Sequence, residues 1–539
     1  MLRPMKRFAL LAAVLLSACG DDNKPATGPD ASQMGSDAGS TASLDSIKHV
    51  VVIYAENRGF DNVYGKFPGA NGLPTTLPQQ LDRDGSVLTK LPRAWGGVTA
   101  AGFTPAIPEA SSDNLANTPY SLPVTYPGFG DTTITRDLYH RFFENQMQID
   151  GGVNDMFAAY ADSGGLVMGY NDGSHMALWA LAQQFTLADN FFMGAFGGSF
   201  LNHQYLICAC APEFANADTD AAHPTVAVID SDASGMLPSL TLASDSPASA
   251  LTGAPKFMLS GNLAPKNYFG DNTWRAVNTM GPPYQPSFNA PAAADASHLY
   301  ADRTKPNTLP PQSQMTIGDQ LDAKSVTWAW YAGAWTSTLA TAIGDRMFPP
   351  TTVPGSAPNF QFHHQPFNYY SAFDPMDHAA ARTTHLKDYT DLVHDIETGA
   401  LPAVTFYKPE GDLNQHAGYA SVAAGDQHIA DLVAKLQASP QYADMLIVIT
   451  YDENGGWWDH AAPPVGDLLG PGTRVPAILV GPYVKKNFVD HTQYDTGSVL
   501  RFLDKRFGLA PLPGLMARDS GLTTNGEAKM GDLTNALTF

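Results

Sequence analysis

This sequence is poor in positive charge, in cysteine and in long apolar runs. Its 539 residues hold 31 Lys and Arg against 52 Asp and Glu, a formal net charge of −21, which argues against a nucleic-acid partner because phosphate backbones select basic surfaces. Its 3 Cys are too few for a disulfide framework, and no apolar run approaches the roughly 18 residues that suggest a membrane span. The 44% of hydrophobic residues is ample for the core of one large domain or two ordinary ones.

The N-terminus carries the pattern of an export signal. Basic residues precede an uninterrupted run of apolar or small residues at 8–18, which predicts a secretory signal peptide over residues 1–18. The run ends in LSAC, which resembles the lipobox of bacterial lipoproteins, where the Cys is acylated. The resemblance implies a membrane lipid anchor on Cys19 and a place in the cell envelope, facing the periplasm or the cell surface. An ordinary signal peptide with an incidental Cys is the alternative.

The segment that follows is almost without residues to bury. Residues 19–46 are dominated by Gly, Ala, Ser and Asp, so we expect a flexible linker and a single folded domain over 47–539. The two remaining cysteines, Cys208 and Cys210, are spaced C-x-C. A disulfide between them would be strained, so buried free thiols are favoured, and the absence of a second matching pair leaves zinc unsupported.

Short runs rich in Val and Ile alternate with helical patterns. Such a pattern predicts an α/β sheet of buried parallel strands with helices on both faces. The expected strands are 49–54, 403–407, 445–451 and 475–480, and the expected helices are 426–436 and 496–507. Two stretches, near 73–131 and 211–311, are rich in Pro, Gly, Ala, Ser and Asp, and we expect them to be long insertions that are functional or form a small subdomain.

Oxygen ligands follow two of the predicted strands. Glu56 and Asn57 come after the first strand, and Asp452 and Glu453 come after the 445–451 strand. The carboxyl ends of parallel strands meet at one edge, where α/β proteins bind ligands, and carboxylates so close repel one another unless a cation lies between them. The pair of motifs therefore predicts a metal site, whereas either motif alone is more typical of a helix N-cap.

A third motif combines tight-turn glycines with a hydroxyl. Gly197 and Gly198 precede Ser199 at the start of a predicted helix, where the hydroxyl and backbone N–H groups can face an anion such as a phosphate. A simple helix N-cap explains the same residues when they are taken alone.

Four segments together resemble a known family. They are IKHVVVIYAENRGFDNVYGKFPG, LADNFFMGAFGGSFLNHQ, YDENGGWWDHAAPP and RVPAILVGPYVKKNFVDHTQYDTGSVLRFLDKRFG. This chain resembles, over about 47–509, the bacterial phosphoesterases that join acid phosphatases and phosphatidylcholine-type phospholipases C within the alkaline-phosphatase-like superfamily, and it is closest to the acid phosphatase branch. The resemblance implies a three-layer sandwich around a mostly parallel sheet.

The same resemblance assigns roles to the motifs. Ser199 stands where the family has its nucleophile and would also be a metal ligand, with Glu56, Asn57, Asp452 and Glu453 as the other ligands. The soft thiolates are absent from this set, so its oxygens indicate one hard divalent cation of the Ca²⁺, Mg²⁺ or Mn²⁺ class.

Histidines complete the site in this family. The chain has 15 His, and the candidates are His140, His363, His364, His416 and His460. A protonated histidine can bind the phosphate or give a proton to the leaving alcohol, and the sequence leaves the choice between these roles open.

These observations favour a metal-dependent acid phosphatase that hydrolyses small phosphate monoesters through a phosphoserine at Ser199. The first alternative is a phospholipase C acting on phosphatidylcholine-type lipids. Against it, phospholipases usually carry Thr at the nucleophile position and continue into further C-terminal domains, whereas this chain ends about thirty residues after Gly508. An alternative of another class is a non-catalytic surface lipoprotein that binds anions.

Overall fold

We describe the protein from a computed structural model. Residues 43–219, 308–340 and 359–539 are described continuously, and between them the structure describes residues 241–242, 258–259, 262–264, 266–278, 283–284 and 291–305. The predicted signal peptide, Cys19, most of the linker and much of the 211–311 insertion lie outside the described residues. Among the described helices, none is both long and apolar enough to cross a membrane.

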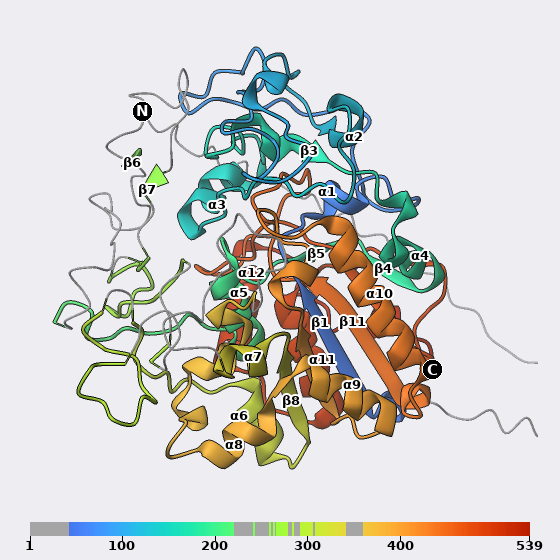
Figure 1. The fold of residues 1–539 in the computed structure, drawn as a ribbon. Coiled ribbons are helices and arrows are strands. Elements are labelled where there is room, and N and C mark those ends of the chain that lie inside the picture. The colour runs from blue at the N-terminus through green and yellow to red at the C-terminus, as the bar shows by residue number, and fades with distance from the viewer. Residues whose placement is uncertain are drawn as a thin grey trace, which may run out of the picture. The chain divides into compact units, whose positions relative to one another are not determined.

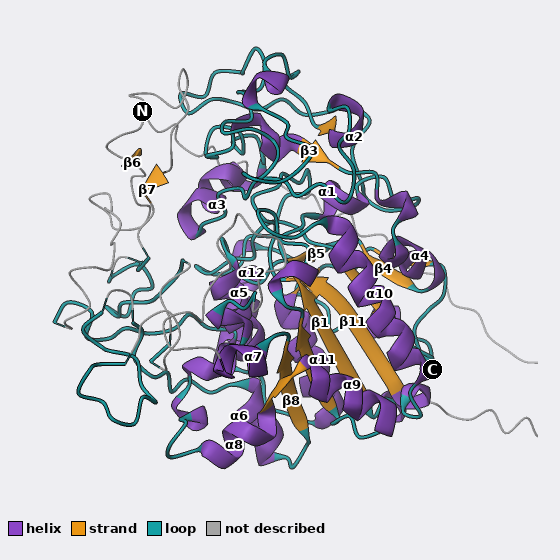
Figure 2. Cartoon of the chain, in the orientation of Figure 1, coloured by secondary structure: helices purple, strands orange, loops and turns teal. Residues whose placement is uncertain are grey.

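An eight-stranded sheet forms the centre of the fold and confirms the predicted α/β class (Figures 1 and 2). In spatial order its strands are β13 (Phe488–Asp490), β4 (Thr186–Ala188), β12 (Ala477–Val480), β11 (Met445–Tyr451), β1 (His49–Ala55), β10 (Val404–Lys408), β8 (Trp328–Ala332) and β9 (Leu386–Asp388). The long central strands β1 and β11 are buried almost throughout, as their unbroken apolar runs predict.

Helices cover both faces of this sheet. On one face, α10 (Val422–Ala438) packs against α4 (Ala177–Gln184) and α9 (Tyr389–Thr398); on the other, α5 (Ser199–Cys208) packs against α11 (Thr496–Phe507). The remaining helices are α1 (Phe60–Tyr64), α2 (Leu122–Thr125), α3 (Phe142–Ile149), α6 (Ile317–Ala323), α7 (Trp335–Ala340), α8 (Ala379–His385) and α12 (Pro513–Asn525).

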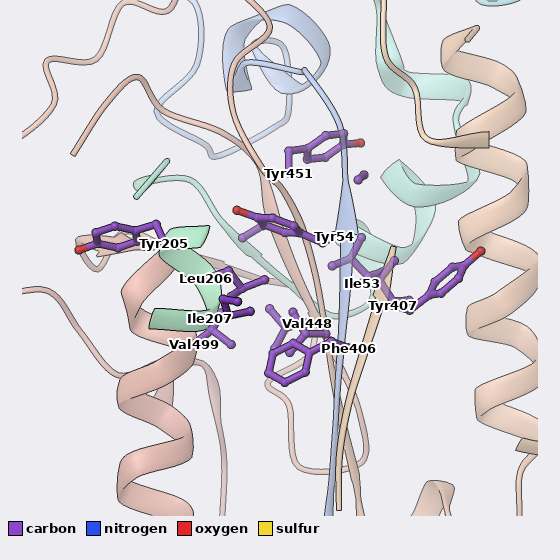
Figure 3. Packing of buried hydrophobic residues seen from close by; sticks show 14 of the residues in the cluster. Ile53, Tyr54, Tyr205, Leu206, Ile207, Phe406, Tyr407, Val448, Tyr451 and Val499 are labelled. Atoms are coloured by element: carbon purple, nitrogen blue, oxygen red, sulfur yellow. The ribbon is translucent and has the colours of Figure 1, made fainter. Parts of the chain in front are cut away.

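Side-chain alternation explains the two packed faces. Phe406 and Val448 lie in one row across the strands and face Val499 of α11 (Figure 3). Tyr407, the next residue, points the other way, and its hydroxyl lies 2.6 Å from Nε2 of His428 on α10. Both predicted amphipathic helices, 426–436 and 496–507, thus pack on the sheet as their apolar stripes require.

Strand β12 corrects one expectation. The run at 475–480 was expected to be a parallel strand, but β12 pairs antiparallel with both β11 and β4. The 25 residues between Tyr451 and Ala477 contain no helix, so the chain returns directly along the sheet instead of crossing back over a face. A parallel return needs such a crossover.

The two cysteines of the C-x-C motif also differ from expectation. Free thiols were expected, whereas Cys208 and Cys210 form a disulfide. Cys208 ends helix α5, and Ala209 between the two cysteines adopts a left-handed conformation (φ 49°) as the helix C-cap. This sharp turn brings the two Cα atoms to 5.1 Å, a separation at which a disulfide can close.

The 73–131 insertion contributes to a separate hydrophobic cluster. Its members include Leu91, Leu122 and Phe129, together with Phe157 and Trp457. Trp457 follows β11, so this cluster lies by the carboxyl end of the sheet, where the chain is mostly loop (Figure 2). The insertion is therefore packed next to the edge at which the strand-end motifs converge.

Candidate active site

The loop before helix α5 places Ser199 at the helix N-terminus. Gly197 has a positive φ of 86°, and a Cβ on it would lie 2.4 Å from the backbone nitrogen of Phe142. One turn into the helix, the Asn202 side chain accepts from the Ala195 N–H at 2.9 Å and donates to the Ala195 carbonyl at 3.1 Å. The turn that aims Ser199 is thus held by a glycine-only conformation and by a side chain of the same helix.

The Ser199 hydroxyl meets both strand-end motifs. Its Oγ lies 3.2 Å from Oδ1 of Asn57 and 3.3 Å from Oε1 of Glu453, so it can donate to either. The two motifs also contact each other, because the Asn57 N–H donates to Oδ1 of Asp452 at 3.1 Å. Four of the residues predicted as metal ligands therefore lie together, and all are buried.

Glu56, the fifth predicted ligand, is surrounded by donors. Its Oε1 lies 2.7 Å from Nζ of Lys408 and 2.8 Å from Nε2 of His364. Its Oε2 accepts from Asn414 at 2.6 Å and from the Tyr419 hydroxyl at 3.0 Å. Glu56 is thus held in place by side chains from β10, from the chain after it and from the 3-10 helix Phe362–His364.

The buried carboxylates divide by their pKa values. Burial alone would raise the pKa of Glu56, but Lys408 and His364 outweigh it and hold that pKa well below its usual range. Burial raises the pKa of Asp452 to about 7 although Lys408 opposes the shift, and burial together with the charge of Asp452 raises the pKa of Glu453 well above its usual range. The chain thus compensates the charge of Glu56 and leaves the pair after β11 without a comparable partner.

The structure separates the predicted histidines into two groups near this site and one residue apart from it. His363 and His364 belong to the Glu56 side, with His363 Nε2 3.8 Å from Oε1 of Glu56. His140 lies on the other side, its Nε2 3.5 Å from Oε1 of Glu453, and its ring packs edge-on against that of His416 at 5.7 Å between centroids. Burial lowers the pKa of all four.

His460 contacts a different set of residues. Its Nδ1 lies 2.6 Å from Oδ2 of Asp61 and its Nε2 lies 3.1 Å from Oδ1 of Asn71. Arg474 contacts both Asp61 and Asp459 at 3.1 Å in the same network. Among the described contacts, none joins His460 to Ser199 or to the strand-end carboxylates, so its surroundings are those of a structural ion network.

A cavity of about 570 Å³ opens next to His140. Its lining includes the charged and aromatic residues Arg136, Asp137, Tyr139, Arg141 and Asp162, and Gly96 and residues 99–101 of the 73–131 insertion form another part of the wall. Arg136 and Asp162 pair at 3.0 Å. His140 lines this cavity and also lies 3.5 Å from Glu453, which contacts Ser199.

Several residues at the site were missed by the sequence reasoning. Lys408 follows the expected strand 403–407 and was not singled out, although it ends β10 and a lysine that closes a buried apolar run brings a cation to the sheet edge. His203 follows Ser199 by one helical turn and its Nδ1 lies 2.8 Å from the Ser199 carbonyl oxygen. Periodicity could have placed His203 on the nucleophile's side of the helix, but Asn414 and Tyr419 lie in loops without such a signal.

The residues present fit a hard divalent cation. Oxygen atoms of Asn57, Ser199 and Glu453 converge, and the buried Oδ2 of Asp452 has no hydrogen-bond partner among the described residues. Buried polar atoms are normally paired, and an oxygen donor set with two carboxylates is what Ca²⁺, Mg²⁺ and Mn²⁺ prefer.

A buried serine at a helix N-terminus, facing carboxylates at the carboxyl ends of strands, is the arrangement of an α/β enzyme that cleaves ester bonds. The chain belongs to the Phosphoesterase family, whose model matches residues 47–510. It is a phosphoric ester hydrolase.

The similar proteins of known name are phospholipases. Phospholipase C B and phospholipase C A of Mycobacterium tuberculosis (strain ATCC 25618 / H37Rv) are 21% and 22% identical to this chain over 530 residues, and each comparison covers 92% of this chain and 78% of the relative. A solved protein of the alkaline phosphatase superfamily from Vibrio parahaemolyticus is 12% identical, covers 38% of this chain and 50% of its own, and has a TM-score of 0.23, a likeness on which no argument rests. The named relatives favour the phospholipase C alternative over the acid phosphatase interpretation.

Proposed function

We propose that this chain is a phospholipase C-type phosphodiesterase that carries the phosphoryl group on Ser199 during turnover. The observation that supports it most directly is the position of the Ser199 hydroxyl, within 3.3 Å of Glu453 and 3.2 Å of Asn57, in a chain whose named relatives are phospholipases C. A weakly acidic hydroxyl becomes a nucleophile when an adjacent group takes its proton or a cation stabilises its anion.

The proposed reaction has two displacements. Ser199 Oγ bonds to phosphorus as the bond from phosphorus to the glycerol oxygen breaks, and the leaving oxygen takes a proton to give diacylglycerol. Water then attacks the same phosphorus, the bond to Oγ breaks, and the phosphorylated head group leaves while Ser199 regains its proton. His140 lines the cavity and His416 packs against the His140 ring, so these two are the candidates to give the proton to the leaving alcohol.

A bound divalent cation would be held by Asn57, Ser199, Asp452 and Glu453, with Glu56 adjoining them. Such a cation stabilises negative charge on the transferring group and on the attacking oxygen. The chain's own contribution is to keep these oxygens together in a buried place, where electrostatic interactions are strong.

The cavity beside His140 indicates which part of the substrate it holds. Its lining is partly apolar, but the charged residues Arg136, Asp137, Arg141 and Asp162 also line it, and we expect these charges to contact a polar head group. We expect Arg141→Ala to raise KM for a substrate with a head group more than for a simple phosphate ester.

A phosphomonoesterase acting on small phosphate esters is the second candidate. The observation that favours it is the serine at position 199, where the phospholipases of the resembled family usually carry threonine. We also propose that a lipid anchor on Cys19 holds the enzyme at the cell envelope. Cys19→Ala should then release the protein from the membrane fraction, and retention there would refute the anchor.

Trapping the covalent intermediate tests the function. After an acid quench during turnover of phosphatidylcholine, mass spectrometry of the Ser199 peptide should show a phosphodiester adduct that retains the head group, and Ser199→Ala should show neither adduct nor turnover. Bare phosphate on Ser199, formed only from a monoester such as p-nitrophenyl phosphate, would indicate the phosphatase. No adduct and no turnover with either substrate would leave the non-catalytic anion-binding lipoprotein.

A further inference from the structure

Lys408 is a completely buried cation beside the site. It is the last residue of β10, its side chain and that of Glu56 are both 0% exposed, and its Nζ lies 2.7 Å from Oε1 of Glu56. Ionised side chains are almost never buried in this way unless they are paired. The pairing therefore compensates two charges that would each be costly alone.

The Lys408–Glu56 pair stands apart from the other acids at the site. In the described part of the chain, no Lys or Arg lies within ion-pair distance of Asp452 or Glu453, whose only such neighbours are His203 at 3.7 Å and His140 at 3.5 Å. Glu56, by contrast, accepts hydrogen bonds from His364, Asn414 and Tyr419 and forms an ion pair with Lys408, so that both of its oxygens have partners. The protein thus provides a cationic partner for Glu56 and no Lys or Arg partner among the described residues for Asp452 or Glu453.

The charge balance of the site explains why only Glu56 needs a lysine partner. With a divalent cation bound, the three buried carboxylates would carry three negative charges, of which Lys408 would balance one and the cation the other two. The Lys408 ammonium thus supplies a positive charge that additional bound metal would otherwise have to supply. Because Lys408 ends a strand, the sheet fixes the position of this charge.

We propose that Lys408 is a positioning residue, the internal counter-ion that pairs with Glu56 and fixes its carboxylate against His364, so that one divalent cation completes the site. The proposal deepens the metal-dependent hydrolysis proposed above and rests on it for its catalytic consequence. Lys408 acts through Glu56, and its loss should lower kcat more than it raises KM.

A double-mutant cycle on the metal-free protein tests the pairing separately from catalysis. Thermal midpoints are compared for wild type, Lys408→Met, Glu56→Gln and the double variant, all in chelator. Because removing one partner leaves the other charge buried and unpaired, we expect Lys408→Met to lower the midpoint strongly and the added Glu56→Gln to restore most of that loss. A double variant as unstable as Lys408→Met, or more so, would overturn the proposal.

Lys48→Met is the matched control. Lys48 lies 2.6 Å from Asp444, but its side chain is 64% exposed, and exposed pairs contribute little, so this variant should keep a near-wild-type midpoint and activity. If Lys408→Met does not fold, the double variant decides, since a folded double variant supports the pairing and an unfolded one refutes it.

The catalytic role of Lys408 is tested by measuring kcat and KM after the divalent cation is added back. For a soluble chromogenic phosphoester, a folded Lys408→Met protein should lose about tenfold or more in kcat with KM nearly unchanged, and an unchanged kcat would overturn the positioning role. Absence of turnover in the wild type would refute the proposed function instead, and the midpoint cycle would still decide whether Lys408 and Glu56 are counter-ions.

Discussion

Replacing Arg474 with Met should destabilise the protein by an amount that the structure sets. The Arg474 side chain is 0% exposed, and its guanidinium lies 3.1 Å from a carboxylate oxygen of both Asp61 and Asp459. It also donates to the backbone carbonyls of Asn71 and Asp189 at 2.7 and 2.8 Å. Methionine keeps most of the stem but leaves two buried carboxylates without their strongest partner. Breaking a buried pair by removing one member costs about 3–5 kcal/mol.

Urea unfolding followed by tryptophan fluorescence measures this loss, with Arg93→Met as the control. Arg93 pairs with Asp113 at 2.7 Å, but its side chain is 52% exposed, so its removal should cost no more than about 1 kcal/mol. The network links helix α1 to the loop between β11 and β12, so Arg474→Met should also weaken binding of Mn²⁺ in calorimetry. A loss in stability no larger than that of Arg93→Met would refute the structural role assigned to the network that contains His460.

Three further outcomes are expected. Gly197→Ala should lower stability by about 1–3 kcal/mol through backbone strain and reduce kcat, because the new Cβ would lie 2.4 Å from the Phe142 backbone. Gly85→Ala is the control, since Gly85 has a similar φ of 81° but no atom within 4 Å, and it should leave kcat unchanged. Equal kcat in both variants would contradict this expectation. Burial lowers the pKa of His428 to about 4, below the ordinary value of about 6.5, so stability should fall as the pH drops through this interval, by up to about 3 kcal/mol. The fall should be shallower in His428→Gln, and urea midpoints at pH 7 and pH 5 that shift equally in both proteins would argue against it. Chelation should abolish ester hydrolysis and lower the thermal midpoint, with recovery on adding Ca²⁺, Mg²⁺ or Mn²⁺; full activity in excess chelator would exclude the cation.

The central strands and helices were predictable because their signals are local. The apolar run at 445–451 has the same bounds as β11, and the helix expected at 496–507 has the same bounds as α11. The three-residue strands β4, β9 and β13 are too short to show a period. The direction of β12 depends on the path of the chain between strands, which no local pattern records.

At the site, the sequence predicted which residues lie at the sheet edge but not which charged groups pair with one another. Strand ends meet at one edge, so the convergence of Glu56, Asn57 and Asp452 followed from the strand predictions. Lys408 was missed because a lysine at a strand end is usually solvated, and only the packing shows that it is buried against Glu56.

From the sequence by itself, the apolar period gave the α/β class, and the resemblance carried by four segments gave the family and the residues expected around Ser199. Tertiary structure decided which charges face one another. It placed Lys408 against Glu56, His140 towards Glu453 and His460 in the Arg474 network. The physical reason is that electrostatic partnership depends on distances of a few ångströms between segments far apart in the chain, and only the packed fold fixes such distances.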